Sequence, residues 1–160
     1  MDNVIENAIA LRKEGKYSES RRLLEGLLLN EHYQGQAHLH IAWSFDNEGR
    51  EQLAISHYQQ ALLGKLTSIE RFDTLFGLAS TFTSLGQYKK ALRYFEKTID
   101  EYPNSVEVQP FYAMCLYNLG EHKKATSLLL ELLISTTSSE AIKEYQRAIL
   151  LYAKDLDQKW

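Results

Sequence analysis

The fold is decided by residues 75–98, LFGLASTFTSLGQYKKALRYFEKT, in which two helical patterns meet at Gly86. On both sides of this glycine apolar residues recur three or four positions apart, which is the spacing of one helix face. Before the glycine stand Leu75, Leu78, Ala79 and Phe82, and after it stand Tyr88, Ala91, Leu92, Phe95 and Ile99. Glycine takes up a left-handed backbone conformation at little cost and commonly follows the end of a helix. The stretch therefore predicts a helix, a tight turn and a second helix.

The same pattern occurs four times in the 160-residue chain. Glycines stand at positions 15, 49, 86 and 120, with separations of 34, 37 and 34 residues. Each glycine is followed after five, nine and twelve residues by a small or apolar side chain: Ser20/Leu24/Leu27, Ala54/Tyr58/Ala61, Ala91/Phe95/Thr98 and Ala125/Leu129/Leu132. A period of this size is typical of a helical repeat array.

The periodicity predicts helices over residues 2–14, 18–30, 35–47, 51–63, 68–85, 88–101, 105–118, 122–135 and 139–157, each boundary being good to about two to four residues. Three helix starts carry the signature of a capping box, in which a capping oxygen precedes a glutamate by three residues: Thr67 with Glu70, Asn104 with Glu107, and Thr137 with Glu140. No alternating pattern long enough for a sheet is present.

The chain is expected to form one all-α domain over residues 1–160, with repeats at about 1–34, 35–68, 69–105 and 106–138 and a terminal helix within 139–160. The terminal segment carries an apolar stripe and has no glycine turn. We interpret it as a helix that covers the open end of the array. Docking of the same helix elsewhere, or on a second chain, is the alternative.

Composition narrows the class of function. The net charge is −3, which argues against binding to a phosphate backbone, and no apolar run approaches the ~20 residues of a membrane span. The first residues lack the basic and apolar regions of a signal peptide. Cys115 is the only cysteine, so no intrachain disulfide is possible and a cytoplasmic location is expected.

These residues resemble the tetratricopeptide repeat, whose pattern combines a leucine–glycine turn with alanines and aromatic residues at fixed positions. The third repeat matches best, through Leu78, Ala79, Phe82, Gly86, Tyr88, Ala91, Phe95 and Pro103. The early tryptophan of the pattern is absent and is replaced by Val4, His38, Leu75 and Gln109. The resemblance covers nearly the whole chain and implies a right-handed α-α superhelix of four helix pairs with a C-terminal capping helix.

A finer resemblance links several stretches to a group of small bacterial tetratricopeptide proteins of unassigned activity. The stretches are Ala42–Asp46, Ser56–Tyr58, Gly77–Thr81 and Glu144–Ile149. This likeness strengthens the fold prediction and adds little about function.

In tetratricopeptide arrays the first helices of the pairs line a concave groove, and the resemblance places a candidate peptide-binding set there. The set is Ile5, Ile9, Arg12, Leu39, His40, Trp43, Asp46, Phe76, Ser80, Thr83, Phe111, Met114 and Tyr117. Trp43, Phe76 and Tyr117 offer rigid rings, and Met114 offers an adaptable thioether. The simpler interpretation is that these side chains only pack against neighbouring helices or a folded-back tail.

One binding mode of such arrays is not expected. Some of them clamp a terminal carboxylate with lysine, asparagine and arginine, and the resemblance maps those positions to Ile5, Ile9, His40, Asp73 and Gly77. None of these carries a fixed positive charge, and Asp73 would repel a carboxylate.

No catalytic, metal or cofactor motif is found, so no enzyme, metal site or cofactor is expected. His38 and His40 point about 200° apart on a helix and cannot share one metal ion. Lys89–Lys90 and Lys123–Lys124 follow two of the turns and are interpreted as ordinary surface charge, the alternative being a basic stripe that binds nucleic acid.

The leading hypothesis is a non-enzymatic scaffold that binds a protein or peptide. Structural homodimerisation is the second hypothesis, and a sensor of a small ligand or signalling peptide is the third.

Overall fold

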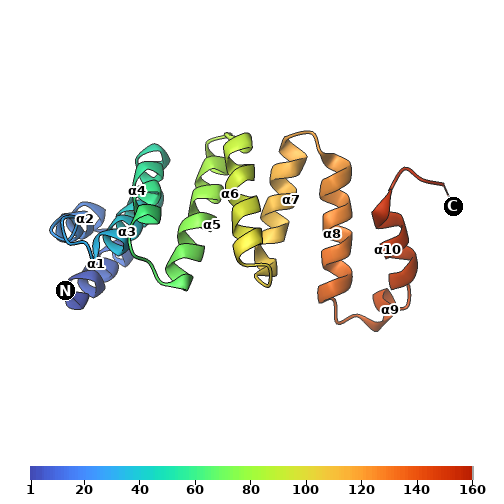
Figure 1. Cartoon of the computed structure of the whole chain (residues 1–160), viewed down its shortest axis with the longest axis horizontal. Helices are drawn as coiled ribbons and strands as arrows, with labels where there is room; N and C mark the ends of the chain where they lie inside the picture. The colour runs from blue at the N-terminus through green and yellow to red at the C-terminus, as the bar shows by residue number, and fades with distance from the viewer. Residues whose placement is uncertain (160) are drawn as a thin grey trace. The chain divides into compact units, whose positions relative to one another are not determined.

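The computed structural model describes residues 1–159, which form helices and no strand (Figure 1). The elements are α1 (Asp2–Lys13), α2 (Tyr17–Glu25), α3 (Gln34–Asn47), α4 (Glu51–Leu63), α5 (Ser68–Ser84), α6 (Tyr88–Glu101), a 3₁₀ turn η1 (Val106–Val108), α7 (Gln109–Asn118), α8 (His122–Thr136), α9 (Glu140–Lys143) and α10 (Gln146–Lys154). The all-α fold class is confirmed.

The four spaced glycines all have positive φ angles, between 71° and 83°. At each of them the glycine N–H and the following N–H donate back to carbonyls of the preceding helix, which satisfies acceptors that a helix end leaves open. At Gly49, for example, the glycine N–H bonds Asp46 at 3.0 Å and the Arg50 N–H bonds Phe45 at 2.8 Å. The predicted helix–turn–helix units are therefore confirmed by one repeated turn.

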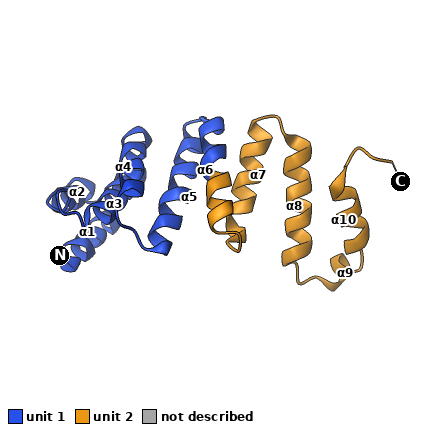
Figure 2. Cartoon of the chain, in the orientation of Figure 1, with its two compact units in different colours: residues 1–94 blue, residues 95–160 orange. Residues whose placement is uncertain are grey.

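The chain forms two compact units, residues 1–94 and 95–160, with the boundary inside α6 (Figure 2). Each unit has its own set of packed helices. The single domain over residues 1–160, with its four repeat boundaries, stays a prediction.

In unit 1 the helices from α1 to α5 pack one against the next along the chain, and α3 also contacts α1 and α5. The core between the first helices is built from small and branched side chains: Ile5, Ala8, Leu24, Leu27, Ala37 and Ile41. The residue five positions after each of the first two turns, Ser20 or Ala54, is also buried. Small residues there let the helices approach closely, and the Ser20 hydroxyl is satisfied by donating to the Ala8 carbonyl at 2.7 Å.

A buried arginine ties the first helix pair to the second. Arg21 on α2 donates to the Ser44 hydroxyl on α3 at 2.9 Å and pairs with Glu48 at 3.0 Å. Its guanidinium also lies 4.1 Å from the centre of the Phe45 ring. These contacts supply the hydrogen bonds and countercharge that a buried cation requires.

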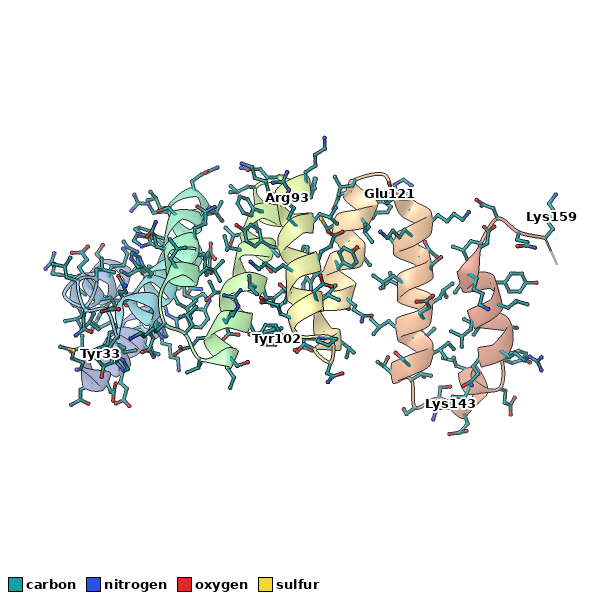
Figure 3. The ribbon with its side chains drawn as sticks, in the orientation of Figure 1. Tyr33, Arg93, Tyr102, Glu121, Lys143 and Lys159 are labelled. Atoms are coloured by element: carbon teal, nitrogen blue, oxygen red, sulfur yellow. The ribbon has the colours of Figure 1, made fainter. Side chains whose placement is uncertain are left out.

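In unit 2, α8 packs between α7 and α10, and Ala113, Leu116, Ala125 and Ala153 are buried. Figure 3 shows Glu121 at the turn between α7 and α8 and Lys143 in α9, at opposite ends of α8. Helix α10 thus caps α8, as expected. It has nine residues, and Leu129 and Leu133 on α8 remain exposed.

Three predicted helices differ from the structure. Helix α2 ends at Glu25 rather than near residue 30, because Gly26 begins a series of tight turns in which Leu27 and Leu28 donate three residues back. The segment predicted at 105–118 starts with η1, and Pro110 falls in the first turn of α7, where its missing N–H costs nothing.

The segment predicted as one helix over 139–157 is two helices, α9 and α10, separated at Glu144–Tyr145. No glycine or proline marks the break. Helix α10 ends at Lys154 because Asp155 has an extended backbone and its carboxylate accepts a bond from Lys123 on α8.

One of the three predicted capping boxes is confirmed. Thr67 accepts from the Glu70 N–H, and the Glu70 carboxylate accepts from the Thr67 N–H at 2.8 Å. The box at Asn104 was wrong because Ser105 precedes the 3₁₀ turn. The box at Thr137 was also wrong, because Ser139 caps α9 and the Thr137 hydroxyl accepts from the Ser139 N–H.

The turn at Gly49 yields a stability prediction. No atom lies within 4 Å of a Cβ added at Gly49, so Gly49→Ala causes no steric clash. The substitution is destabilising only because alanine disfavours the left-handed backbone conformation. We expect a loss of about 1 kcal/mol in the free energy of unfolding, measured by urea denaturation. Gly26→Ala is the control, since its φ is −62° and alanine fits there. Equal effects of the two substitutions would contradict this role of the turn.

Candidate functional site

The first helices of unit 1 bring most of the predicted groove residues together. Helix α3 contacts both α1 and α5, so side chains of α3 lie close to side chains of the other two helices. We use the term first-helix face for Arg12, His40, Trp43, Asp46, Phe76, Ser80 and Thr83. The exposed predicted residues of α7 belong to unit 2 and are described separately below.

Three of the predicted residues serve the core. Leu39 is 0% exposed and Ile5 is 4% exposed, so neither offers side-chain surface to a partner. Ile9 is half-buried and packs against the core of the first helix pair. Their positions were inferred from the repeat pattern, which does not separate groove-facing from core-facing apolar residues.

An arginine, an indole and an imidazole form the centre of the first-helix face. Arg12 on α1 donates to Asn47 on α3 at 2.9 Å, and its guanidinium lies 5.3 Å from the centre of the Trp43 ring. The His40 ring meets Trp43 edge-on at 5.1 Å. Burial, and secondarily the charge of Arg12, lowers the pKa of His40 to about 4, so this imidazole is neutral at physiological pH.

Asp46 joins three helices beside this cluster. Its Oδ2 atom accepts from the Tyr58 hydroxyl on α4 and from the Thr81 hydroxyl on α5, the latter at 2.8 Å. Burial raises the pKa of Asp46, and the two hydroxyl donors oppose that rise. Sequence reasoning predicted Asp46 but missed Asn47, Tyr58 and Thr81, because hydrogen bonds between helices leave no pattern along the chain.

Unpaired polar atoms are concentrated on the first-helix face. Within residues 1–159, the buried side-chain atoms that lack a hydrogen-bond partner are Nε of Arg12, Nδ1 of His40 and Oδ1 of Asp46. Each such atom costs about 1–3 kcal/mol. Each such group in a native structure calls for an explanation, and a polar atom of a bound molecule is one.

Helix α5 contributes half-buried residues to the same face. The Phe76 ring lies 5.8 Å from that of Phe72. The Thr83 hydroxyl donates within its own helix, to Ala79 at 2.8 Å, so its methyl group is the part left for contact. Ser80 is also half-buried.

In unit 2, Phe111, Met114 and Tyr117 are 45%, 54% and 61% exposed. They recur every third residue on α7, a helix without a charged side chain. The Tyr117 ring lies 4.6 Å from the His122 ring, with the two planes tilted by 30°. These three residues form a second, uncharged apolar surface.

A histidine pair was missed by the sequence analysis. The Nδ1 atoms of His38 on α3 and His57 on α4 lie 2.9 Å apart, so one ring donates and the other accepts. Burial lowers the pKa of His57 to about 4, and the nearby charges of His38 and Arg21 add to this effect. No group of three metal-ligating residues occurs in the described part of the chain. Burial raises the pKa of the Cys115 thiol, which disfavours the reactive thiolate.

The repeated turns and paired helices agree with a comparison against known families. The sequence model of the tetratrico peptide repeat matches residues 35–156. The chain belongs to the tetratricopeptide repeat family. No helix within residues 1–159 combines the length and apolar character needed to cross a membrane.

Two curated proteins resemble parts of the chain. Photosystem I assembly protein Ycf3 of Synechococcus sp. (strain CC9311) is 32% identical over 77 residues, which are 48% of this chain and 40% of that protein. Response regulator aspartate phosphatase H of Bacillus subtilis (strain 168) is 34% identical over 64 residues, 39% of this chain and 17% of that protein. The chain therefore spans less than half the length of these relatives.

Among solved structures, YrrB, described as a TPR protein with an unusual peptide-binding site, superposes with a TM-score of 0.71 at 18% identity. The match covers 98% of this chain and 78% of YrrB. At this identity the likeness establishes the tetratricopeptide fold alone.

The buried histidines yield a pH prediction. The pKa of His40 is lower in the folded chain than the ordinary 6.5, so the unfolded chain binds more protons between pH 6.5 and 4. The free energy of unfolding should therefore fall as the pH drops through this range, by about 2 kcal/mol from His40 between pH 7 and pH 5. Urea denaturation at the two pH values measures the loss.

His40→Phe should remove that part of the pH dependence while keeping the ring against Trp43. His32→Phe, at an exposed position, is the control. A His40→Phe protein that loses as much stability at pH 5 as the parent chain would contradict the assignment.

Proposed function

We propose that the chain is a non-enzymatic scaffold that binds a protein or peptide on the first-helix face of unit 1. The observation that carries this proposal is the concentration of the unpaired buried atoms of Arg12, His40 and Asp46 around Trp43. An extended peptide or short helix places apolar side chains against rings and offers polar groups beside them. Trp43 and Phe76 are the expected anchors, since aromatic side chains dominate binding energy at interfaces.

Membership in the tetratricopeptide family supports a binding role over a catalytic one. The names of similar proteins are consistent with a binding role, because one relative is named an assembly protein and one similar structure is described as having a peptide-binding site. The cytoplasmic location expected from the single cysteine stays a prediction.

A homodimer is the second candidate, favoured by the exposed stripe of Phe111, Met114 and Tyr117 on α7. An uncharged surface of this kind is typical of an interface. Sedimentation equilibrium over a range of concentrations decides this candidate. A dimer that Met114→Glu dissociates supports it, and a monomer at every concentration rejects it.

The scaffold proposal is tested with peptides selected from a random phage-displayed library against the immobilised protein. The double variant Trp43→Ala/Phe76→Ala should lower the affinity for the selected peptides at least tenfold, which corresponds to about 1.4 kcal/mol of binding free energy. Leu53→Ala, which removes an exposed apolar residue on α4, is the matched control and should leave affinity unchanged. Circular dichroism verifies that each variant keeps its helices. Full affinity in a folded double variant would contradict the proposal.

A further inference from the structure

Helix α10 presents a second surface that the proposed function does not use. One face of this helix carries Gln146, Arg147, Leu150, Leu151 and Lys154, which line an open pocket of about 600 Å³ in unit 2. The two leucines of this set are 36% and 38% exposed. Arg147 and Lys154 stand one helical turn to either side of them, so the order along the face is cation, leucine, leucine, cation.

The opposite side of α10 is the side that serves the fold. Helix α10 packs against α8, and its inner residues are the buried Ala153 and the half-buried Ile149. Leu151 lies two positions from each of them, about 200° around the helix. Side chains project from α10 both toward α8 and away from it (Figure 3). Leu151 therefore points away from the side that packs on α8, and Leu150, about 60° from Ala153 around the helix, borders that side.

The two cations on this face are not neutralised within the described residues. Neither Arg147 nor Lys154 forms an ion pair with residues 1–159. The acid nearest to Arg147 along the chain is Glu144, and no ion pair joins the two side chains. The acids nearest to Lys154 are Asp155 and Asp157 of the tail, which Lys123 on α8 binds at 2.7 Å and 2.8 Å. The tail carboxylates are therefore used elsewhere.

A second copy of the chain fits this face poorly. A symmetric pair of α10 helices would run antiparallel about the leucines, and each Arg147 would then face a lysine of the other copy. Like charges placed opposite one another disfavour such an interface. The positive charges of Arg147 and Lys154 instead favour an acidic partner.

We propose that this face of α10 binds an amphipathic helix of another protein in which a pair of apolar residues is flanked by carboxylates. The partner's apolar pair would pack on Leu150 and Leu151, and its acids would pair with Arg147 and Lys154. Matching of charges at both ends sets the register of such a helix, and burial of the leucines supplies the attraction.

The test uses two labelled alanine-based helical peptides of about 18 residues, a length at which an isolated helix forms. One carries Glu, Leu, Leu and Glu at positions i, i+3, i+4 and i+7, and the other carries Lys in place of both Glu. Fluorescence anisotropy at low ionic strength should show that the full chain binds the Glu peptide at least tenfold more tightly than the Lys peptide. Added salt should reduce that difference.

The double variant Arg147→Glu/Lys154→Glu should bind the Lys peptide more tightly than the Glu peptide. The double variant Leu150→Ala/Leu151→Ala should have a lower affinity for both peptides. Arg22→Glu/Lys89→Glu, which reverses two exposed cations on α2 and α6, is the control and should bind like the parent chain. Trp43→Ala/Phe76→Ala should also bind these peptides normally, which separates this surface from the first-helix face.

Three results would overturn the proposal: equal affinity for the two peptides, no binding of the Glu peptide, or a preference unchanged in the charge-reversed variant. Binding of the chain to vesicles of phosphatidylglycerol and phosphatidylcholine, abolished by Arg147→Glu/Lys154→Glu and without binding of the Glu peptide, would assign the surface to an anionic membrane instead.

Discussion

The arrangement of helices depends on a turn with a positive φ angle at four spaced glycines. Because the two N–H groups at each turn close back on the preceding helix, the chain reverses within a few residues and the second helix packs on the first. Small buried residues such as Ser20 and Ala54 then allow close packing of each pair. In unit 1 the result is that α3 lies between α1 and α5, and side chains far apart in sequence share one face.

That face combines stabilising bonds with unpaired polar atoms. Asp46 ties α3 to α4 and α5 through Tyr58 and Thr81, yet its second oxygen has no partner. Arg12 and His40 each leave one nitrogen unpaired in the same cluster. Buried arginine contacts elsewhere, such as Arg21 with Ser44 and Glu48, show that this chain can satisfy buried polar groups. The unpaired atoms lie on the first-helix face, where the scaffold proposal places a partner.

Features set by local chemistry were predictable from the sequence, and features set by contacts between helices were not. The glycine turns, the helix pairs and the capping box at Thr67 follow from short patterns. The break at Tyr145 has no local signal, and the link from Lys123 to Asp155 joins residues in different elements. For the candidate site, the repeat pattern found Arg12, Trp43 and Asp46. It also included Leu39, which is buried, and it missed the pair of His38 and His57 across two helices.

The central claim is that the first helices of unit 1 form a recognition surface. It is tested most directly by chemical-shift mapping of the isotopically labelled chain with a bound, library-selected peptide. The account predicts that the largest shift changes fall on Arg12, the Trp43 indole and Phe76. Changes confined to the outer faces of α2 and α4, with none on α1, α3 or α5, would contradict it.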